Sequence, residues 1–203
     1  MAEPSEEHTD SQSSLRGVFS RGRAARAKAD RSIEALEVVD ATGVDQDTLW
    51  ATLRRLPGGV TIVSALGDDG YVGITVSACC LVSLTPPLFL VSLHNESSVL
   101  EAIGGGSGFA VSMLSGRHEF LADAFAGRAP RPDARWSRIQ HRTAVTGAPM
   151  LSDALAWLDC RLWQQVAAGD HTLLLGLVVA ASVTAEQDDP LLFFGSQYRR
   201  LAP

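Results

Sequence analysis

The sequence predicts a mainly β protein in which an antiparallel β-barrel is accompanied by a few short helices. About seven strand-like runs follow one another with only short helical segments between them, which disfavours a doubly wound parallel sheet. One run, "HTLLLGLVVAA" (171–181), is apolar at every second position on both faces. Because a barrel interior covers only one face of a strand, we expect a second subunit to cover the other, which predicts a homodimer.

The amino-terminal part of the chain differs in composition from the rest. Residues 1–32 are polar and charged, with basic residues concentrated between Arg16 and Arg31. Such a segment buries too little apolar surface to offset the entropy of ordering. We therefore expect residues 1–44 to be a disordered or loosely helical tail and residues 45–203 to be the ordered domain.

The ordered domain should open with a helix over "DQDTLWATLRRL" (45–56), which begins with acidic residues and carries Leu49, Leu53 and Leu56 along one side. The sequence Pro57-Gly58-Gly59 ends it. The later elements follow from apolar runs and turn residues. Strands are expected at "VTIVSAL" (60–66), "YVGITVSACCLVSL" (71–84), "LFLVSL" (88–93), "GFAVSML" (108–114), two long runs joined at Gly169-Asp170 (154–186) and "PLLFFGSQYRRL" (190–201); short helices at "SSVLEAI" (97–103) and "RHEFLADAFA" (117–126); and a polar surface excursion over 127–142.

Composition excludes several classes of function. The net charge of −6 argues against a nucleic-acid partner. We find no apolar run of 18 or more residues and no apolar signal core, so we expect neither a membrane partner nor secretion, and a cytoplasmic location. The three cysteines lack CxxC spacing, which predicts free thiols and no metal site. Lys28, the only lysine, lies in the tail, so phosphate groups must be bound by arginine, hydroxyls or backbone N–H groups.

Three features are candidates for a binding site, each with a structural alternative. The uncharged run 73–93 contains five hydroxyl residues that either bond to the protein or bind a polar, planar ligand. They are Thr75, Ser77, Ser83, Thr85 and Ser92. Asn95 and Ser97 either cap the following helix or help its amino-terminal end to bind a phosphate. His171, which opens an apolar strand, is either structural or catalytic.

Taken in order, several motifs resemble those of a known family. They are "LRRLPGGVTIVSA", "GITVSACCLVSLTPPLFLVSL", "SSVLEAI…GFAVSML", "GAPMLSDALAWLDC", "GDHTLLLGLVV" and "PLLFFGSQY". The chain is similar to flavin reductases of the two-component monooxygenase type, which have the FMN-binding split-barrel fold. The resemblance runs from about Leu49 to Tyr198 and implies a homodimeric split β-barrel with Greek-key topology.

The resemblance also implies site residues. The segment that would line the flavin ring consists of Gly73, Ile74, Thr75, Val76, Ser77 and Ala78, with Phe125 nearby. The segment that would hold the ribityl and phosphate oxygens consists of Ser92, Leu93, His94, Asn95, Ser97 and Ser98. Gly169, Asp170 and His171 match the segment for the nicotinamide nucleotide, and His171 is the expected catalytic side chain beside the hydride path.

The implied activity is hydride transfer from NADH or NADPH to FMN or FAD, with the reduced flavin supplied to a partner monooxygenase. The alternative is a non-catalytic flavin or haem carrier on the same fold. Two positions depart from the family pattern: Ala78-Cys79 replaces a common Ser-Phe pair, and Glu96 stands where relatives often have a basic residue. Arg54 or Arg55 is a candidate to supply the missing cation.

Overall fold

The computed structural model describes residues 43–105, 108–128, 136–184 and 188–201. Contacts divide the chain into two units, Met1–Val44 and Asp45–Pro203, and the second contains every element described below. The expected disordered or loosely helical tail lies outside the described residues except for Gly43 and Val44. None of the described helices is long and apolar enough to cross a membrane.

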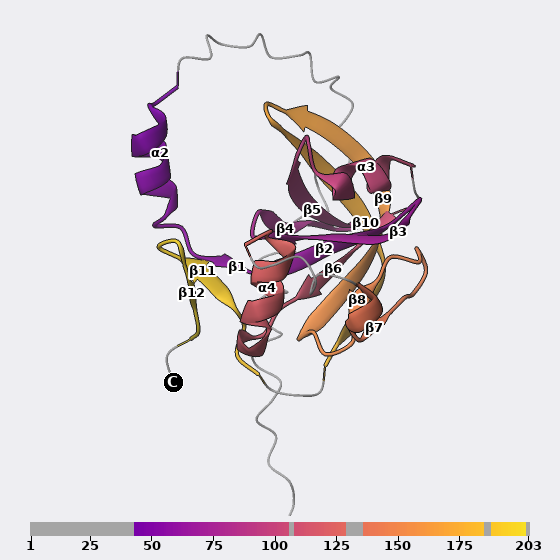
Figure 1. Cartoon of the computed structure of the whole chain (residues 1–203). Coiled ribbons are helices and arrows are strands. Elements are labelled where there is room, and N and C mark those ends of the chain that lie inside the picture. The colour runs from indigo at the N-terminus through magenta and orange to yellow at the C-terminus, as the bar shows by residue number, and fades with distance from the viewer. Residues whose placement is uncertain (1–42, 106–107, 129–135, 185–187, 202–203) are drawn as a thin grey trace, which may run out of the picture. The chain divides into compact units, whose positions relative to one another are not determined.

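The second unit is built on one antiparallel sheet of seven strands, in the order β3-β2-β6-β9-β10-β5-β4 (Figure 1). Its strands are β2 (Thr61–Gly67), β3 (Gly70–Val76), β4 (Cys79–Leu84), β5 (Pro87–His94), β6 (Gly108–Met113), β9 (Ala156–Ala168) and β10 (His171–Val183). A smaller sheet joins β1 (Gly58–Gly59), β11 (Leu192–Phe194) and β12 (Gln197–Arg199). A third pairs β7 (His141–Arg142) with β8 (Met150–Leu151). The predicted mainly β class is therefore confirmed.

The two edge strands of the large sheet are consecutive in the chain, and this makes the sheet curl. If the sheet were flat, β3 and β4 would be about 29 Å apart, at about 4.8 Å per strand spacing. Only Ser77 and Ala78 separate them, and the chain from Val76 to Cys79 spans at most about 11 Å. The prediction of one strand over 71–84 was therefore wrong, because the chain leaves one edge of the sheet here and joins the other.

The main core lies on the concave side of this sheet. Val63, Val91, Phe109 and Leu174 come from four strands and are fully buried. Gly176 in β10 leaves the space that the Phe109 ring occupies, since a Cβ there would lie 2.6 Å from Phe109 Cζ. The opposite face of β10 carries alternate leucines that are only half-buried. The two faces of this strand are therefore both apolar, and one of them lacks full cover in the single chain.

Two short helices close the sheet's ends. The helix α3 (Ser98–Gly105) buries Val99 and Ile103 against the core. The turn η2 (Gly116–His118) leads into α4 (Glu119–Phe125), whose Phe125 packs against Trp136 with ring centroids 5.3 Å apart. Trp136 opens η4 (Trp136–Arg138) and is buried. The expected surface excursion over 127–142 is therefore anchored in a second core by this aromatic ring.

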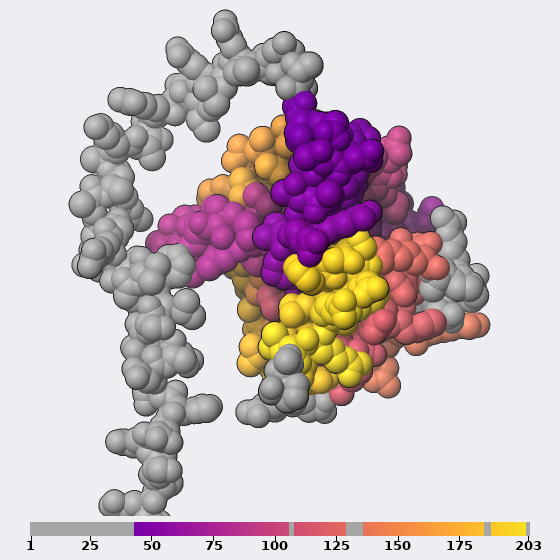
Figure 2. Space-filling view, turned by 90° about the vertical axis from the view of Figure 1, so that its left-hand side faces the viewer, coloured from indigo at the N-terminus to yellow at the C-terminus, as the bar shows by residue number. Residues whose placement is uncertain are grey.

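The first helix, α2 (Gln46–Leu53), confirms the predicted capped helix. The structure buries none of its residues. Asp45 caps its start, because the Asp45 Oδ1 accepts a hydrogen bond from the Thr48 N–H at 2.9 Å. Its far end is fixed by the Gly195 N–H, which donates to the Arg54 carbonyl at 3.0 Å. Figure 2 shows this segment in indigo directly against the yellow C-terminal hairpin.

Candidate functional site

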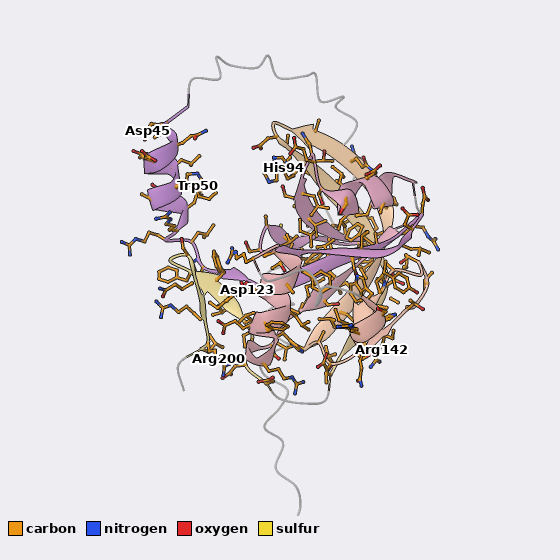
Figure 3. All side chains as sticks on the ribbon, in the orientation of Figure 1. Asp45, Trp50, His94, Asp123, Arg142 and Arg200 are labelled. Atoms are coloured by element: carbon orange, nitrogen blue, oxygen red, sulfur yellow. The ribbon has the colours of Figure 1, made fainter. Side chains whose placement is uncertain are left out.

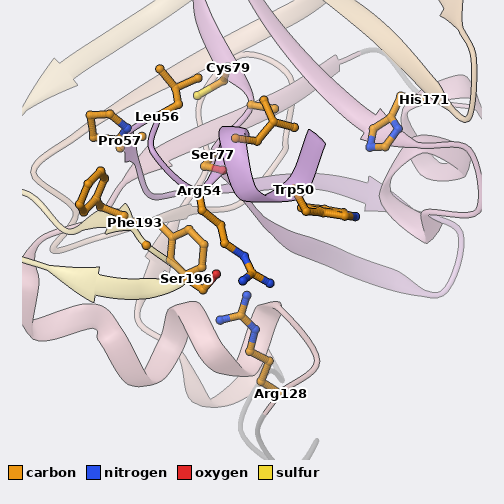
Figure 4. A pocket seen from close by; sticks show the side chains of 16 residues that line it. Trp50, Arg54, Leu56, Pro57, Ser77, Cys79, Arg128, His171, Phe193 and Ser196 are labelled. Atoms are coloured by element: carbon orange, nitrogen blue, oxygen red, sulfur yellow. The ribbon is translucent and has the colours of Figure 1, made fainter. Parts of the chain in front are cut away.

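A cleft of about 1130 Å³ opens between α2, the β11–β12 hairpin and the link between β3 and β4. It is large enough for a nucleotide-sized ligand, since small-molecule pockets usually measure about 300–1,000 Å³. Figure 4 shows its side chains. The lining residues are Trp50, Leu53, Arg54, Leu56, Pro57, Gly58, Gly59, Ser77, Ala78, Cys79, Arg128, His171, Phe193, Phe194, Gly195 and Ser196.

One face of α2 forms a wall of this cleft. Trp50, Leu53 and Arg54 are spaced i, i+3 and i+4, which places them on the same side of a helix. The Trp50 side chain is exposed, with 61% of its residue surface accessible. Of the leucines that the sequence places along one side of this helix, Leu53 and Leu56 line the cleft and Leu49 does not.

Two arginines give the cleft its charge. Arg54 follows the last turn of α2, and Arg128 follows α4; Figure 4 shows their guanidinium groups extending toward one another, with the Ser196 hydroxyl beside them. Arg128 also lies over the Phe193 ring, 5.4 Å from its centroid, and 3.8 Å from an Asp123 oxygen. None of the described residues that line the cleft is an aspartate or glutamate. The cleft is therefore a cationic region in a chain whose net charge is −6.

The floor of the cleft is the link between the two edge strands. Ser77 and Ala78 are exposed and take no part in strand pairing. The Ala78 carbonyl accepts from the Ser92 N–H at 2.9 Å, which fixes the link to β5. Next to it, burial raises the pKa of the Cys79 thiol, so this side chain is an uncharged, half-buried surface. The floor therefore offers backbone N–H groups beside an apolar patch, which suits the edge of a planar polar ring.

His171 lies at the end of the cleft beside Trp50 in Figure 4. Its Nδ1 lies 2.7 Å from Asp170 Oδ1, and this hydrogen bond is the main cause that lowers the pKa of Asp170. Because a carboxylate only accepts, the hydrogen is on Nδ1 and the Nε2 of a neutral ring is left as an acceptor. The ring also meets His94 edge to face, with centroids 5.4 Å apart. This places His171 firmly at the tip of the β9–β10 hairpin.

The polar residues after β5 bind the protein itself. Asn95 Nδ2 donates to the Gly169 carbonyl at 3.2 Å, and Asn95 Oδ1 accepts from Thr172 Oγ1 at 2.9 Å. Ser97 Oγ accepts from the Val99 N–H at 3.3 Å and so caps α3. The capping alternative for Ser97 is therefore confirmed. Asn95 instead connects the segment after β5 to the tip of the β9–β10 hairpin; Figure 3 labels its neighbour His94.

The structure brings some of the expected site residues to the cleft and leaves others elsewhere. Ser77, Ala78 and His171 line it. Thr75 faces α4, where its Oγ1 donates to the Ala122 carbonyl at 2.7 Å. Phe125 lies in the second core against Gly73, where a Cβ would come within 2.8 Å of its ring. The remaining expected residues do not line the cleft: Ile74, Val76, Ser92, Leu93, His94, Asn95, Ser97, Ser98, Gly169 and Asp170.

The cleft also contains residues that the sequence analysis did not assign. Trp50, Arg128 and the hairpin residues Phe193–Ser196 come from segments far apart in the chain. The Gly195-Ser196 pair, both with positive φ, was a readable turn signal. Of the two arginines named as candidates, Arg54 lines the cleft and Arg55 does not.

Comparisons with known proteins find relatives over most of the chain. Residues 53–202 match the family model described as flavin reductase like domain. A relative from Kitasatospora aureofaciens named flavin reductase (NADH) is 38% identical over 161 residues, which are 77% of this chain and 82% of that protein. BorF, described as the flavin reductase component of a bacterial two-component tryptophan halogenase, is 30% identical with a TM-score of 0.71, over 78% of this chain and 99% of that one. The NADH:FAD oxidoreductase SgcE6 of Streptomyces globisporus C-1027, in complex with NAD and FAD fragments, is 30% identical with a TM-score of 0.70, over 83% of this chain and 98% of that one.

Proposed function

Since the chain belongs to the flavin reductase-like family, we propose that it transfers a hydride from a reduced nicotinamide nucleotide to FMN or FAD. The observation that carries this proposal is the cleft, which joins an unpaired backbone link at Ser77–Ala78, a histidine and two arginines. Names of relatives support both substrates, since one is called an NADH-dependent flavin reductase and another is seen with NAD and FAD fragments.

The described residues suit a flavin. No described residue accepts a backbone hydrogen bond from the N–H groups of Ser77 and Ala78, so they are donors for the carbonyl and nitrogen edge of an isoalloxazine ring. Cys79 offers a half-buried apolar contact beside them. Thr75 is already bonded to α4, so the ring belongs on the Ser77 side of the link. Expected flavin contacts at Gly73, Ile74, Val76, Phe125 and the segment Ser92–Ser98 stay part of the proposal.

A bound flavin supplies the acceptor for the hydride, and the chain supplies position and electrostatics. His171, held by Asp170, presents Nε2 to the cleft and orients the donor ring by a hydrogen bond. The segment Gly169–His171 is the proposed nicotinamide-nucleotide site. Hydride transfer requires no side-chain nucleophile, which fits a cleft lined by apolar groups and cations.

We propose that the domain over 45–203 is a split β-barrel with Greek-key topology that works as a homodimer. The curled sheet supports the barrel, since its edge strands are joined by two residues. Uncovered apolar surface supports the dimer. Leu81, Val82 and Leu84 on the edge strand β4 are 49%, 50% and 55% exposed. Such a strand is usually covered by a partner.

We further propose that the reduced flavin leaves for a flavin-dependent monooxygenase. BorF is described as one component of a two-component system, which supports a separate partner. Transfer of reduced flavin to a separate enzyme requires that the flavin dissociate into solution. A cleft that is open to solvent permits this dissociation.

Anaerobic mixing of the protein with NADH and excess FMN tests the activity. We expect the visible absorbance of the flavin to bleach over many turnovers. A flavin carrier would instead retain one flavin per chain and show no NADH-dependent turnover. Running FMN and FAD against NADH and NADPH identifies the preferred pair.

A further inference from the structure

The wall formed by α2 has an apolar and cationic face that the described protein leaves uncovered. No residue of this helix is buried, and Trp50 and Leu53 are 61% and 47% exposed. A helix of eight residues is not stable by itself in water. Yet both ends are fixed, by the Asp45 cap and by the bond from Gly195 to the Arg54 carbonyl. The structure thus holds an uncovered helix face in position at the cleft.

Of the two cations that face each other across this cleft, Arg54 has no anion among the described residues and Arg128 has one at the outer limit of ion-pair distance. For Arg54 the described structure records no ion pair. Arg128 lies 3.8 Å from Asp123 Oδ1, and that oxygen also accepts a hydrogen bond from the Tyr198 hydroxyl at 3.1 Å, so Arg128 shares its only recorded anion among the described residues. Two guanidinium groups that point toward one another repel, and the repulsion grows as solvent is displaced. An anion of two charges between them removes that repulsion. Guanidinium groups bind phosphate oxygens in pairs, with charge-assisted hydrogen bonds.

We propose that Arg54 and Arg128 form a clamp for the diphosphate of the nicotinamide nucleotide and that Trp50 stacks on one of its rings. This inference rests on the proposed function and adds residues to it. Trp50 and Arg54 are one helical turn apart on the same face, so they contact neighbouring parts of one ligand. The Ser196 hydroxyl lies beside the two guanidinium groups and provides a further donor (Figure 4).

The nicotinamide nucleotide fits this clamp better than the flavin does. The segment expected for the flavin phosphate, Ser97–Ser98, does not line the cleft, whereas His171, expected beside the nicotinamide, does. The diphosphate of NADH carries two charges, which match the two arginines as the phosphates of FMN or FAD also would, so the choice of NADH rests on which expected segments line the cleft. The nicotinamide and adenine rings of NADH are joined through that diphosphate. When one of these rings stacks on the Trp50 side chain, the phosphates therefore lie near Arg54.

The test compares Arg54→Gln and Arg128→Gln with Arg55→Gln as the matched control. Arg55 is the next residue in the chain, is exposed and does not line the cleft. We expect each cleft substitution to raise the KM for NADH about tenfold and to leave the KM for FMN within about twofold. The Arg55→Gln variant should match the wild type in both.

A binding measurement separates this inference from the proposed activity. ADP-ribose contains the diphosphate and adenosine without nicotinamide, so calorimetry measures its affinity without turnover. We expect Arg54→Gln and Arg128→Gln each to weaken ADP-ribose about tenfold, and added salt to weaken the wild type more than either variant. We also expect ligand to quench Trp50 fluorescence, seen as a loss of quenching in Trp50→Phe.

Three results would overturn the clamp. In the first, the arginine variants raise the KM for FMN and leave that for NADH unchanged, which assigns the clamp to the flavin phosphate. In the second, Arg54→Gln and Trp50→Phe change the association state by light scattering and leave ADP-ribose affinity unchanged, which assigns the α2 face to a second copy of the chain. In the third, ADP-ribose binds all variants and the wild type equally. A wild type that binds ADP-ribose through both arginines and reduces no flavin would refute the activity alone.

Discussion

Asn95→Ala should loosen the hairpin tip that carries His171 without unfolding the sheet. The side chain of Asn95 makes two hydrogen bonds to this tip, one to the Gly169 carbonyl and one from the Thr172 hydroxyl. A neutral hydrogen bond contributes about 0.5–1.5 kcal/mol net to stability. Because both of these bonds are exposed to solvent, we expect each to contribute in the lower half of that range. Their joint loss is therefore about 1–2 kcal/mol, or roughly 5–30-fold in the local opening equilibrium.

Hydrogen exchange measures this opening directly. We expect amides between Gly169 and Thr172 to exchange roughly 5–30-fold faster in Asn95→Ala, while strand centres keep their protection. The backbone hydrogen bond from the Asn95 N–H to the Asp170 carbonyl survives the substitution. It still holds the hairpin tip, so the increase in exchange rate should not exceed this range. Because His171 follows this turn, kcat/KM for NADH should fall by no more than the same factor.

Thr172 supplies the matched control, since Thr172→Val removes only one of the two bonds and Thr172→Ser removes neither. We expect about half of the free-energy effect in the first variant and none in the second. Unchanged exchange at the hairpin tip in Asn95→Ala would refute the reasoning. So would a loss of protection spread equally over the sheet, because Asn95 would then stabilise the whole fold.

Three further predictions follow from other parts of the chain. Gly176→Ala should destabilise the fold by about 1–3 kcal/mol, since its Cβ would lie 2.6 Å from the buried Phe109 ring. Gly104→Ala should stabilise the fold by about 0.5–1 kcal/mol, because open space surrounds this position in α3. Denaturation midpoints equal to that of the wild type would contradict both predictions. Burial raises the pKa of Tyr198 to about 12, so the folded state favours the neutral phenol and its stabilisation should be lost as the pH rises from about 10 to 12. A phenolate absorbance titration that shows only ordinary tyrosines in the wild type, or no change in Tyr198→Phe, would refute this. His171→Ala should slow hydride transfer in stopped flow more than it weakens flavin binding, and the reverse pattern would move His171 to the flavin site.

Local chemistry sufficed to predict most of the strands and turns. The Gly169-Asp170 pair joins β9 and β10, and Gly169 has a φ of +66°, which glycine adopts without strain. Ser97 caps α3 as its residue type predicts. These features depend on neighbours within a few positions, so the sequence contains their cause.

One error, and one question that the sequence leaves open, come from constraints that act over long distances. The run 71–84 is uncharged throughout and contains no Gly, Pro, Asn or Asp near Ser77–Ala78, so its pattern predicts one strand. The break at Ser77–Ala78 arises because the sheet's two edges must be joined. In α2 the spacing of Leu49 and Leu53 predicts an apolar face, but hydrophobic periodicity does not distinguish a face that packs on a core from one that lines a cleft.

The site was less predictable because its parts meet only in the folded chain. Arg128 and the Gly195–Ser196 turn reach the cleft from segments with no local sign of binding. The hydroxyl residues of the run 73–93 also differ in what they contact, because their partners come from other parts of the folded chain. Thr75 bonds to α4, and Ser77, two residues further on, faces the cleft. For Thr75 the explanation is a bond to the protein, and that bond depends on where α4 packs.

The break in the strand and the floor of the cleft have one cause. In a continuous strand the N–H groups of Ser77 and Ala78 would alternate between a neighbouring strand and solvent, and fewer would be left for a ligand. Since the chain passes here from β3 to β4, Ser77 and Ala78 lie outside the strand ladders, with Gly58 of β1 packed against Ser77. The donors that suit a planar ligand are therefore a consequence of how the sheet is joined. An insertion that lengthened this link should change the binding surface even with every side chain of the cleft kept. In the site that we propose, we therefore expect it to alter recognition of the ring and to leave recognition of the phosphates by Arg54 and Arg128 in place.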